Sequence, residues 1–548
     1  MPRKSILITG IVFTLVGAFW GAHWAASSSQ DDERMALRKI EDAFLLIAQR
    51  YVDEIDPTEL SEEAIEAMLA DLDPHSVFID AERMQRVQEQ FNAAFEGIGI
   101  SYELIPGPEK SDTLAVLTVL PDGPSEKAGL QSGDRILEVD GQSTIGFTSE
   151  DVQSSLKGPR GTQVVLKVRR PGYTDTLSFT LTRDRIALNT LDTAFMVDEQ
   201  TGLIRLNRFA RTTHAEFRAA FAELKEKGMT RLILDLRGNG GGYMNQAVLL
   251  ADEFVPSGNL IVSQRGRLAE TTETFRSTPG GLYETGALIV LVDENSASAS
   301  EIVAGAVQDH DRGLVVGRRT FGKGLVQNQF ILQDGSALRM TIARYYTPSG
   351  RLIQTPYEGG DRSDYYESKQ ALRSHDAPLS LAEILDEVPD SLRYTTAGGR
   401  TVIGGGGIIP DFWIKSDTLE AFTRYVIGRA IDNDFMRGWW DQYGESVANT
   451  WMATPERFIR EYSVGDTILD DFATFVQSRI VADSLDSQTR EKLVFTQSAQ
   501  RLFSARLKAR IATRMLGSAY WYPAMQAEDE VLQAAMGVWA EATSLASL

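Results

Sequence analysis

Residues 230–255 read TRLILDLRGNGGGYMNQAVLLADEFV, and this stretch decides the class of fold. It begins with an apolar run, continues through a loop of glycines and ends in a segment with helical spacing. A second apolar run, ALIVLVD at 287–293, is also followed by a helical segment, SEIVAGAVQ. Strands this apolar are covered on both faces, as in parallel or mixed sheets with helices packed on them. The sequence therefore predicts an α/β core whose chemistry lies in the two loops that follow these strands.

The glycine-rich loop, GNGGG at 238–242, does not fit a nucleotide-binding motif. The G-x-G-x-x-G pattern counted from Gly238 would need glycine where Tyr243 stands, and no Gly-Lys-Ser/Thr follows. Three consecutive glycines, 240–242, can instead turn their amides into one concavity that suits a developing oxyanion. A plain tight turn is the alternative.

The loop after the second strand contains Ser296, Ser298 and Ser300 in alternation with alanine. Successive helical positions turn by about 100°, so Ser298 points away from the other two, and at most one of the two sides can do chemistry. Ser298 also stands three residues before Glu301, as in a capping box. The residues alone therefore leave two roles open for Ser298, a nucleophile or a helix cap.

A serine nucleophile needs a base, and the chain has five histidines, none of which its position excludes. Lys323, in RTFGKGLVQNQF at 319–330, is another candidate because glycines flank it on both sides. A desolvated lysine loses its proton more easily and can accept one from serine. In an extended chain Gln327 shares a face with Lys323 and could orient its amine. The alternative is a solvated lysine in a turn.

Residues 96–183 change to short strands separated by Gly, Pro and Asp, with one helix at TSEDVQSSLKG. The segments GIGISYEL and VLPDGPSEKAGLQSGDRILEVDGQ, with that helix, resemble a PDZ domain. The resemblance implies that the GIGI turn (Gly97, Ile98, Gly99 and Ile100) binds a terminal carboxylate through its amides, and that the strand edge adds a peptide as an extra strand. Ile98 and Ile100 would line an apolar pocket. A tight turn without a binding role is the alternative.

The N-terminus predicts export and a membrane anchor. Arg3 and Lys4 precede an uncharged segment of 21 residues, Ile6 to Ala26, which is long enough as a helix to cross a hydrocarbon layer of about 30 Å. Trp20 and Trp24 make a poor signal-cleavage site. We therefore expect a single N-terminal transmembrane segment that holds the body of the protein in the cell envelope or periplasm.

Two further regions are predicted to be helical. Before the PDZ-like module, Leu37, Ile40, Phe44, Ile47 and Tyr51 form an apolar stripe, which either packs on its own domain or forms the seam of a homo-oligomer. Towards the C-terminus, FSARLKARIATRML places Phe503, Leu507 and Ile511 four residues apart below a basic face. We expect this region to pack on the protease body; assembly, adaptor binding, substrate restraint and membrane-surface binding are the alternatives.

Composition excludes some partners. The formal net charge of −21 repels phosphate backbones and argues against nucleic acid. The absence of cysteine excludes disulfides and thiolate chemistry. No metal or organic cofactor is implied.

Five motifs in order resemble the carboxyl-terminal processing peptidases: LILDLRGNGGG, VLVDENSASASEIVAGAVQD, VVGRRTFGKGLVQ, ARYYTPSGRLIQ and GGGGIIPD. The family combines a PDZ domain with a serine/lysine peptidase core of the crotonase-like fold class. The resemblance implies that Ser298 is the nucleophile, Lys323 the general base and Gln327 its support. It further implies an oxyanion hole from Ala299 and Gly241, and a supporting role for Asp309.

The sequence thus predicts a multidomain α/β protein with N-terminal and C-terminal helical regions. Its predicted function is that of an exported serine endopeptidase that processes proteins with accessible C-terminal tails. The alternatives are a non-catalytic scaffold that binds tails and a crotonase-type acyl-CoA enzyme. The expected limits are 1–30 for the signal or anchor, 31–95 for the N-terminal helices, 96–183 for the PDZ domain, 184–415 for the peptidase core and 416–548 for the C-terminal helices.

Overall fold

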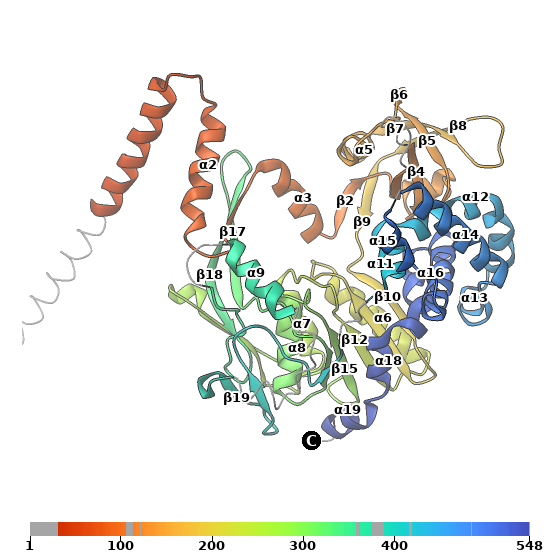
Figure 1. The fold of residues 1–548 in the computed structure, drawn as a ribbon. Helices are drawn as coiled ribbons and strands as arrows, with labels where there is room; N and C mark the ends of the chain where they lie inside the picture. Colours follow the sequence, from red (N-terminus) through yellow and green to blue (C-terminus); the bar gives the residue numbers. More distant parts are fainter. Residues whose placement is uncertain are drawn as a thin grey trace, which may run out of the picture. The chain divides into compact units, whose positions relative to one another are not determined.

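The computed structural model describes residues 31–105, 113–120, 122–357, 362–373, 388–415, 419–483 and 485–546. These residues form two compact units (Figure 1). The first unit contains the chain up to Asp80 with residues 329–340 and 358–362, and the second contains the remainder. Helices, parallel strands and antiparallel strands all occur, which confirms the predicted multidomain α/β class.

The first unit begins with a helix over residues 31–50, followed by α2 (Pro57–Ala70) and β1 (Val77–Ile79). The Asp56 carboxylate caps α2 by accepting the Thr58 N–H at 2.7 Å. Strand β1 pairs antiparallel with residues 337–339 at the start of β18 (Ala337–Tyr346). The predicted apolar stripe of the first helix is largely exposed, with Leu37 at 66% and Tyr51 at 60%.

The prediction of a single transmembrane anchor is corrected. Across the described ranges no helix combines the length and the apolar character that a membrane crossing requires. The segment for which the anchor was predicted, Ile6 to Ala26, lies outside the described residues.

The core of the second unit is a six-stranded sheet in the order β10-β11-β12-β15-β16-β21. Strand β10 is antiparallel to β11, and the other neighbours are parallel. The two apolar runs of the sequence are β12 and β15, and every residue of β15 is buried. The strands are β10 (Leu191–Met196), β11 (Thr201–Leu206), β12 (Arg231–Asp235), β15 (Leu288–Val292), β16 (Leu314–Gly317) and β21 (Phe412–Trp413).

Helices cover both faces of this sheet. On one face Leu232, Leu234 and Val290 pack with α6 (Thr213–Glu226), α7 (Met244–Asp252) and α8 (Ala299–Asp309). On the other face Ile233 and Leu291 pack with α18 (Glu530–Met536) and α19 (Trp539–Ala546), which come from the end of the chain (Figure 1). The alternation follows from the two-residue period of a strand.

Two smaller groups of strands complete the core. Strand β13 (Leu260–Gly266) pairs antiparallel with β14 (Glu273–Arg276) and with residues 343–346 of β18. Strand β17 (Leu325–Ile331) follows the loop that contains Lys323. A short hairpin joins β19 (Arg393–Thr395) to β20 (Thr401–Ile403).

The PDZ-like module is an antiparallel sheet in the order β3-β4-β5-β7-β8, in which β3 is an edge strand and β6 pairs with β5. Its predicted helix is α5 (Ser149–Leu156), which begins with a capping box formed by Thr148 and Asp151. Outside the sheet, β2 (Ala94–Gly97) pairs with β9 (Asp184–Ala187). The other elements are α3 (Ala81–Phe91), β3 (Ile100–Ile105), β4 (Thr113–Val119), α4 (Pro124–Ala128), β5 (Arg135–Val139), β6 (Gln142–Ser143), β7 (Gln163–Arg169) and β8 (Leu177–Thr182).

The C-terminal region is helical and has its own apolar core, in which the predicted Phe503, Leu507 and Ile511 are fully buried. The basic face of α16 does not form an open cationic surface, because Arg506 and Arg510 both donate to the buried Asp432 carboxylate. The helices that precede α18 are α11 (Ala421–Gly428), α12 (Ile431–Trp451), α13 (Pro455–Glu461), α14 (Asp466–Ala482), α15 (Ser487–Glu491), α16 (Gln497–Leu516) and α17 (Trp521–Met525).

This region also contacts the PDZ-like module. The Glu103 carboxylate of β3 accepts hydrogen bonds from Asn433 Nδ2 at 2.7 Å and from Arg437 Nε at 2.9 Å, both on α12. Arg514 of α16 lies 3.7 Å from the same carboxylate. These partners outweigh the effect of burial and lower the pKa of Glu103. The expectation that the C-terminal helices pack on the protease body is met by α18 and α19, which cover one face of the central sheet.

Candidate active site

The three serines differ in their surroundings. Ser296 and Ser300 are fully buried, and their hydroxyls donate to the carbonyls of Leu236 at 2.8 Å and Asn239 at 2.9 Å. Ser298 is partly exposed at the N-cap of α8, with φ 56° and ψ −110°. A non-glycine residue in such a conformation costs about 1–3 kcal/mol, and strain of this kind concentrates at functional sites. The surroundings therefore single out Ser298.

Lys323 lies in the loop between β16 and β17 and is partly buried. Its Nζ donates to Oε1 of Gln327 at 2.8 Å, so the structure brings these two predicted residues together. The chain before Lys323 passes close to other backbone. A Cβ on Gly322 would lie 2.8 Å from the backbone nitrogen of Gly407 and 2.3 Å from Oγ1 of Thr355, and Gly322 has φ +81°. Glycine at 322 is thus required by both space and backbone conformation.

One buried carboxylate joins the serine loop to the lysine loop. Glu301 Oε2 accepts the N–H groups of Ser298 at 2.7 Å and Lys323 at 2.9 Å. Its Oε1 accepts the N–H of Gly322 and the hydroxyl of Thr320, both at 2.6 Å. Burial raises the pKa of Glu301, although four donors favour its ionised form. Sequence reasoning found Glu301 only as the partner of a capping box.

Tyr345 makes a second link between the same loops. Its hydroxyl donates towards the carbonyls of Ser298 at 3.1 Å and Lys323 at 2.6 Å. Burial, together with the charge of Glu301, raises the pKa of Tyr345 well above its ordinary value, so the hydroxyl stays a donor. Tyr345 lies in the motif ARYYTPSGRLIQ, but that motif gave it no role, and it comes from β18, 47 residues after Ser298.

The glycine-rich loop lies directly against the serine loop. A Cβ on Gly241 would lie 2.6 Å from the Ala297 carbonyl oxygen, 2.8 Å from Ser298 Cβ and 3.0 Å from the Ala299 nitrogen. Gly241 and Ala299, the predicted oxyanion residues, are therefore brought beside Ser298. The Gly241 N–H, however, donates to Oδ1 of the buried Asn239 at 2.9 Å.

Asp309 is not near the serine. It is the last residue of α8, ten residues after Ala299, which corresponds to about 15 Å along the helix. Asp309 and Arg351 form a fully buried ion pair at 2.7 Å, and Ser349 donates to the same carboxylate. Its place in the fold supports a structural role.

Two histidines are engaged elsewhere. The Nε2 of His214 lies 2.6 Å from the Glu253 carboxylate, and that of His310 lies 2.6 Å from the Leu260 carbonyl oxygen. His75 belongs to the first unit. His23 and His375 lie outside the described residues.

The PDZ-like module contains the predicted groove. A pocket of about 190 Å³ lies between the start of β3 and α5. Gly97 does not line this pocket but precedes it, and a Cβ there would contact the Phe95 ring at 2.9 Å. The lining residues are Phe95, Ile98, Gly99, Ile100, Tyr102, Val152, Gln153, Leu156 and Lys157.

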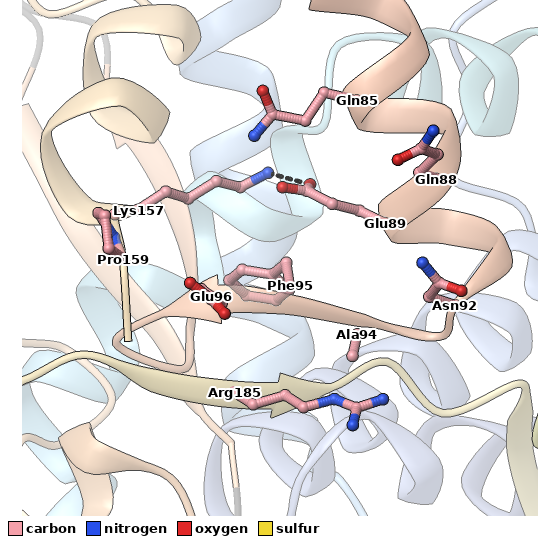
Figure 2. Close-up of a pocket in the computed structure, with 11 residues that line it drawn as sticks. Gln85, Gln88, Glu89, Asn92, Ala94, Phe95, Glu96, Lys157, Pro159 and Arg185 are labelled. Atoms are coloured by element: carbon pink, nitrogen blue, oxygen red, sulfur yellow. Dashed lines mark hydrogen bonds and ion pairs between the residues drawn. The ribbon is translucent and has the colours of Figure 1, made fainter. Parts of the chain in front are cut away.

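A second, more polar cleft of about 560 Å³ adjoins this groove and shares Phe95 and Lys157 with it. Figure 2 shows that side chains of α3, of β2 and of the loop after α5 surround it. Lys157 Nζ donates to the Glu89 carboxylate of α3 at 2.6 Å, so one ion pair crosses the cleft. Sequence reasoning did not anticipate this pair.

We expect Glu301→Gln to impair both stability and turnover. Because each carboxylate oxygen accepts two hydrogen bonds, an amide NH₂ would face two donors, which should cost about 2–4 kcal/mol of unfolding free energy. Turnover of the folded fraction should fall at least about tenfold, because both loops lose a shared anchor. Thermal unfolding and peptidase assays on one preparation measure both effects. Glu294→Gln, which removes the charge that pairs with Arg318 in a partly exposed ion pair, is the control. If Glu301→Gln behaves like this control, Glu301 does not position the site.

Three family models match the chain. Peptidase family S41 matches residues 200–360, a PDZ domain matches residues 116–170, and the N-terminal domain of the activating protease CtpB matches residues 20–83. The first two matches confirm the predicted peptidase and PDZ domains.

Named relatives agree with these models. A carboxy-terminal-processing protease of Bartonella bacilliformis is 35% identical over 358 residues, which cover 65% of this chain and 81% of that protein. The carboxy-terminal processing protease CtpB of Bacillus subtilis is 33% identical over 60% of this chain and 68% of its own length. Among solved structures, the photosystem II D1 C-terminal processing protease is 31% identical, covers 57% of this chain and 89% of its own, and has a TM-score of 0.32. The chain therefore belongs to the carboxy-terminal-processing proteases, serine-type peptidases of family S41 that here include a PDZ domain.

Proposed function

We propose that Ser298 and Lys323 form a catalytic dyad that cleaves proteins presented by their C-terminal tails. The observation that carries the proposal is the shared anchoring of the two loops, since Glu301 accepts the backbone N–H of both residues. The exposure and strained backbone of Ser298 support its role as nucleophile. The hydrogen bond to Gln327 supports an oriented amine on Lys323.

In the proposed reaction, Oγ of Ser298 attacks the scissile carbonyl carbon while the neutral amine of Lys323 accepts the hydroxyl proton. The carbonyl oxygen becomes an oxyanion. Collapse of the tetrahedral intermediate breaks the C–N bond, and the Lys323 ammonium returns its proton to the leaving amine. Water then attacks the acyl carbon while the same amine accepts a water proton. The ester bond to Oγ of Ser298 breaks, the Lys323 ammonium returns the proton to Oγ, and the new carboxyl terminus leaves.

The oxyanion needs preorganised donors. We assign the N–H of Ala299, the first residue of α8, and one amide of the glycine loop. Gly241 is placed against Ser298 Cβ, but its N–H must turn away from Asn239 before it can serve. Asp309 is assigned no step in the reaction.

We further propose that the groove beside α5 binds the tail of the substrate. The edge of β3 can accept the peptide as an added strand, and the apolar pocket beside Ile98 and Ile100 suits its last side chain. The amides of the Gly97–Ile100 turn would neutralise the terminal carboxylate.

A peptide with an apolar last residue should bind the full chain at least about tenfold more weakly when its carboxylate is amidated, because a charge-assisted contact to the turn is lost. Fluorescence anisotropy with Ser298→Ala, which cannot consume the peptide, measures both affinities. A peptide with aspartate in last place controls for the apolar pocket. Equal affinity for the acid and the amide would contradict carboxylate recognition.

The other expectations stay predictions. They include a homo-oligomer built on the exposed N-terminal stripe and the five domain limits. A tail-binding scaffold would bind this peptide and leave an unstructured protein intact, whereas a crotonase-type enzyme would consume an acyl-CoA. Incubation with each substrate therefore separates both alternatives from a peptidase.

A further inference from the structure

The C-terminal helices are built into the peptidase core. The peptidase family model ends at residue 360, so it assigns no role to α18 and α19. Val531, Leu532 and Trp539 of these helices nevertheless pack on the face of the central sheet that contains Ile233 and Leu291. This face belongs to β12 and β15, the strands that lead into the glycine loop and the serine loop. Helices α18 and α19 thus pack against both strands that lead into the site.

One residue of this segment contacts Arg237, the residue directly before the glycine loop. Asp529 precedes α18 and caps it by accepting the Leu532 N–H at 3.0 Å. Its two carboxylate oxygens also accept hydrogen bonds from Nη1 and Nη2 of Arg237, at 2.8 and 2.7 Å. Such a bidentate pair fixes the plane of the guanidinium as well as its position.

Arg237 is the residue directly before Gly238, the first glycine of the loop. Its guanidinium is also held by the buried Asp235, through Nε at 2.9 Å and Nη2 at 2.7 Å. The backbone carbonyl of Arg237 accepts from Nη2 of Arg205 at 2.9 Å. Burial opposes the charge of Arg237, but the two carboxylates raise its pKa well above the ordinary value. Arg237 is therefore charged, and two carboxylates hold its guanidinium at the point where the chain enters the loop.

The rest of the loop has little side-chain mass with which to hold its shape. Four of the five residues from 238 to 242 are glycines, and three of them, Gly238, Gly241 and Gly242, have positive φ. Backbone contacts and the residues at its two ends therefore hold the loop in place. The Gly238 N–H donates to the Asp293 carboxylate at 2.9 Å, and the Gly241 carbonyl accepts the Phe209 N–H at 2.9 Å.

We propose that Asp529 is a positioning residue for the peptidase reaction, which holds the oxyanion-binding glycine loop in place through Arg237. The inference rests on the proposed role of that loop. It assigns to the C-terminal helical region a part in the active site, contributed across 292 residues of sequence.

The test compares Asp529→Asn with wild type in the full chain. Asparagine is as good a helix cap as aspartate, so α18 keeps its start, whereas the charge that pairs with Arg237 is lost. With a short peptide substrate that does not need the groove, kcat should fall at least about tenfold while KM changes less than about twofold, because a loop displaced by a fraction of an ångström weakens the transition state most. Glu528→Gln, which removes a neighbouring charge that is not among the Arg237 partners of the described chain, should match wild type.

A second variant guards against a simple folding defect. Arg237→Lys keeps the positive charge but cannot form the bidentate pair, and it should reproduce the loss in kcat. The double variant should be no worse than the more impaired single variant, since both remove one interaction. A wild-type kcat in Asp529→Asn, or a loss that only follows the unfolded fraction in thermal unfolding, would overturn the inference. Failure of the proposed function would instead appear as an active Ser298→Ala.

Discussion

Replacement of Ser298 by alanine should abolish peptide-bond cleavage in a chain that stays folded. Loss of a serine nucleophile lowers kcat by about 10⁴-fold or more in serine peptidases, because the remaining groups cannot form the acyl-enzyme. The serine side chain that is removed is partly exposed. The hydrogen bond from the backbone N–H of Ser298 to the Glu301 carboxylate does not depend on that side chain. Release of peptides from an unstructured protein measures the effect, and thermal unfolding of the same preparation shows whether the fold is kept.

Ser296→Ala and Ser300→Ala are matched controls from the same loop. Each removes a buried hydroxyl bond, to Leu236 or to Asn239, and should cost about 1–3 kcal/mol of stability with measurable turnover in the folded fraction. The capping interpretation makes the opposite forecast for Ser298→Ala, a loss of about 1 kcal/mol with activity retained. A destabilised but active Ser298→Ala would refute the proposed mechanism.

The strands and their loops were predictable because their signals are local. The run LIVLV is apolar at every position, and such a run is typical of a strand buried on both faces. The helix of the PDZ domain was equally predictable, because its start is marked by a local signal, the capping residue Thr148, which forms a capping box with Asp151. The lysine–glutamine pair followed from the two-residue period of an extended chain, and their hydrogen bond is present.

The support of the site was not predictable, because its contacts join residues far apart in sequence. The hydroxyl of Tyr345 donates to the carbonyl of Ser298 from another strand, and neither a sequence period nor the motif ARYYTPSGRLIQ indicates that contact. The glycine-loop motif indicated no role for Asn239, yet its side-chain oxygen accepts the Gly241 N–H. The family resemblance implied a supporting role for Asp309 but did not indicate its position relative to the serine. In the structure Asp309 lies at the opposite end of α8 from Ser298.

The C-terminal region shows the same limit in another form. Its 3.6-residue period predicted Phe503, Leu507 and Ile511 on one face, and all three are buried. The helical period does not predict which residues contact the opposite, arginine-rich face of α16. The arginines of α16 looked like a basic surface in the sequence, but Arg506 and Arg510 end on one buried carboxylate of α12, Asp432. Charge patterns become informative only when the partner helix is known.

Lys323→Arg should be nearly as damaging as Ser298→Ala. Arginine keeps the positive charge but stays protonated near neutral pH, so it cannot accept the proton of the serine hydroxyl. Lys323→Met, which keeps the length of the side chain and removes the amine, should lose activity to the same degree, because the proposed role is that of a base. Initial rates with a short peptide, together with thermal unfolding, measure both variants.

The pH dependence of turnover tests the same assignment in the unmodified protein. A lysine base is active as the free amine, and the fraction in that form grows as pH rises, so kcat/KM should increase with pH through one ionisation. His214→Ala and His310→Ala should keep this profile, because their rings contact Glu253 and the Leu260 carbonyl. If the increase of kcat/KM with pH disappears in one of these variants, the histidine replaced in it is the base. An active Lys323→Arg would exclude the dyad altogether, because no neutral amine would remain beside the serine loop that Glu301 anchors.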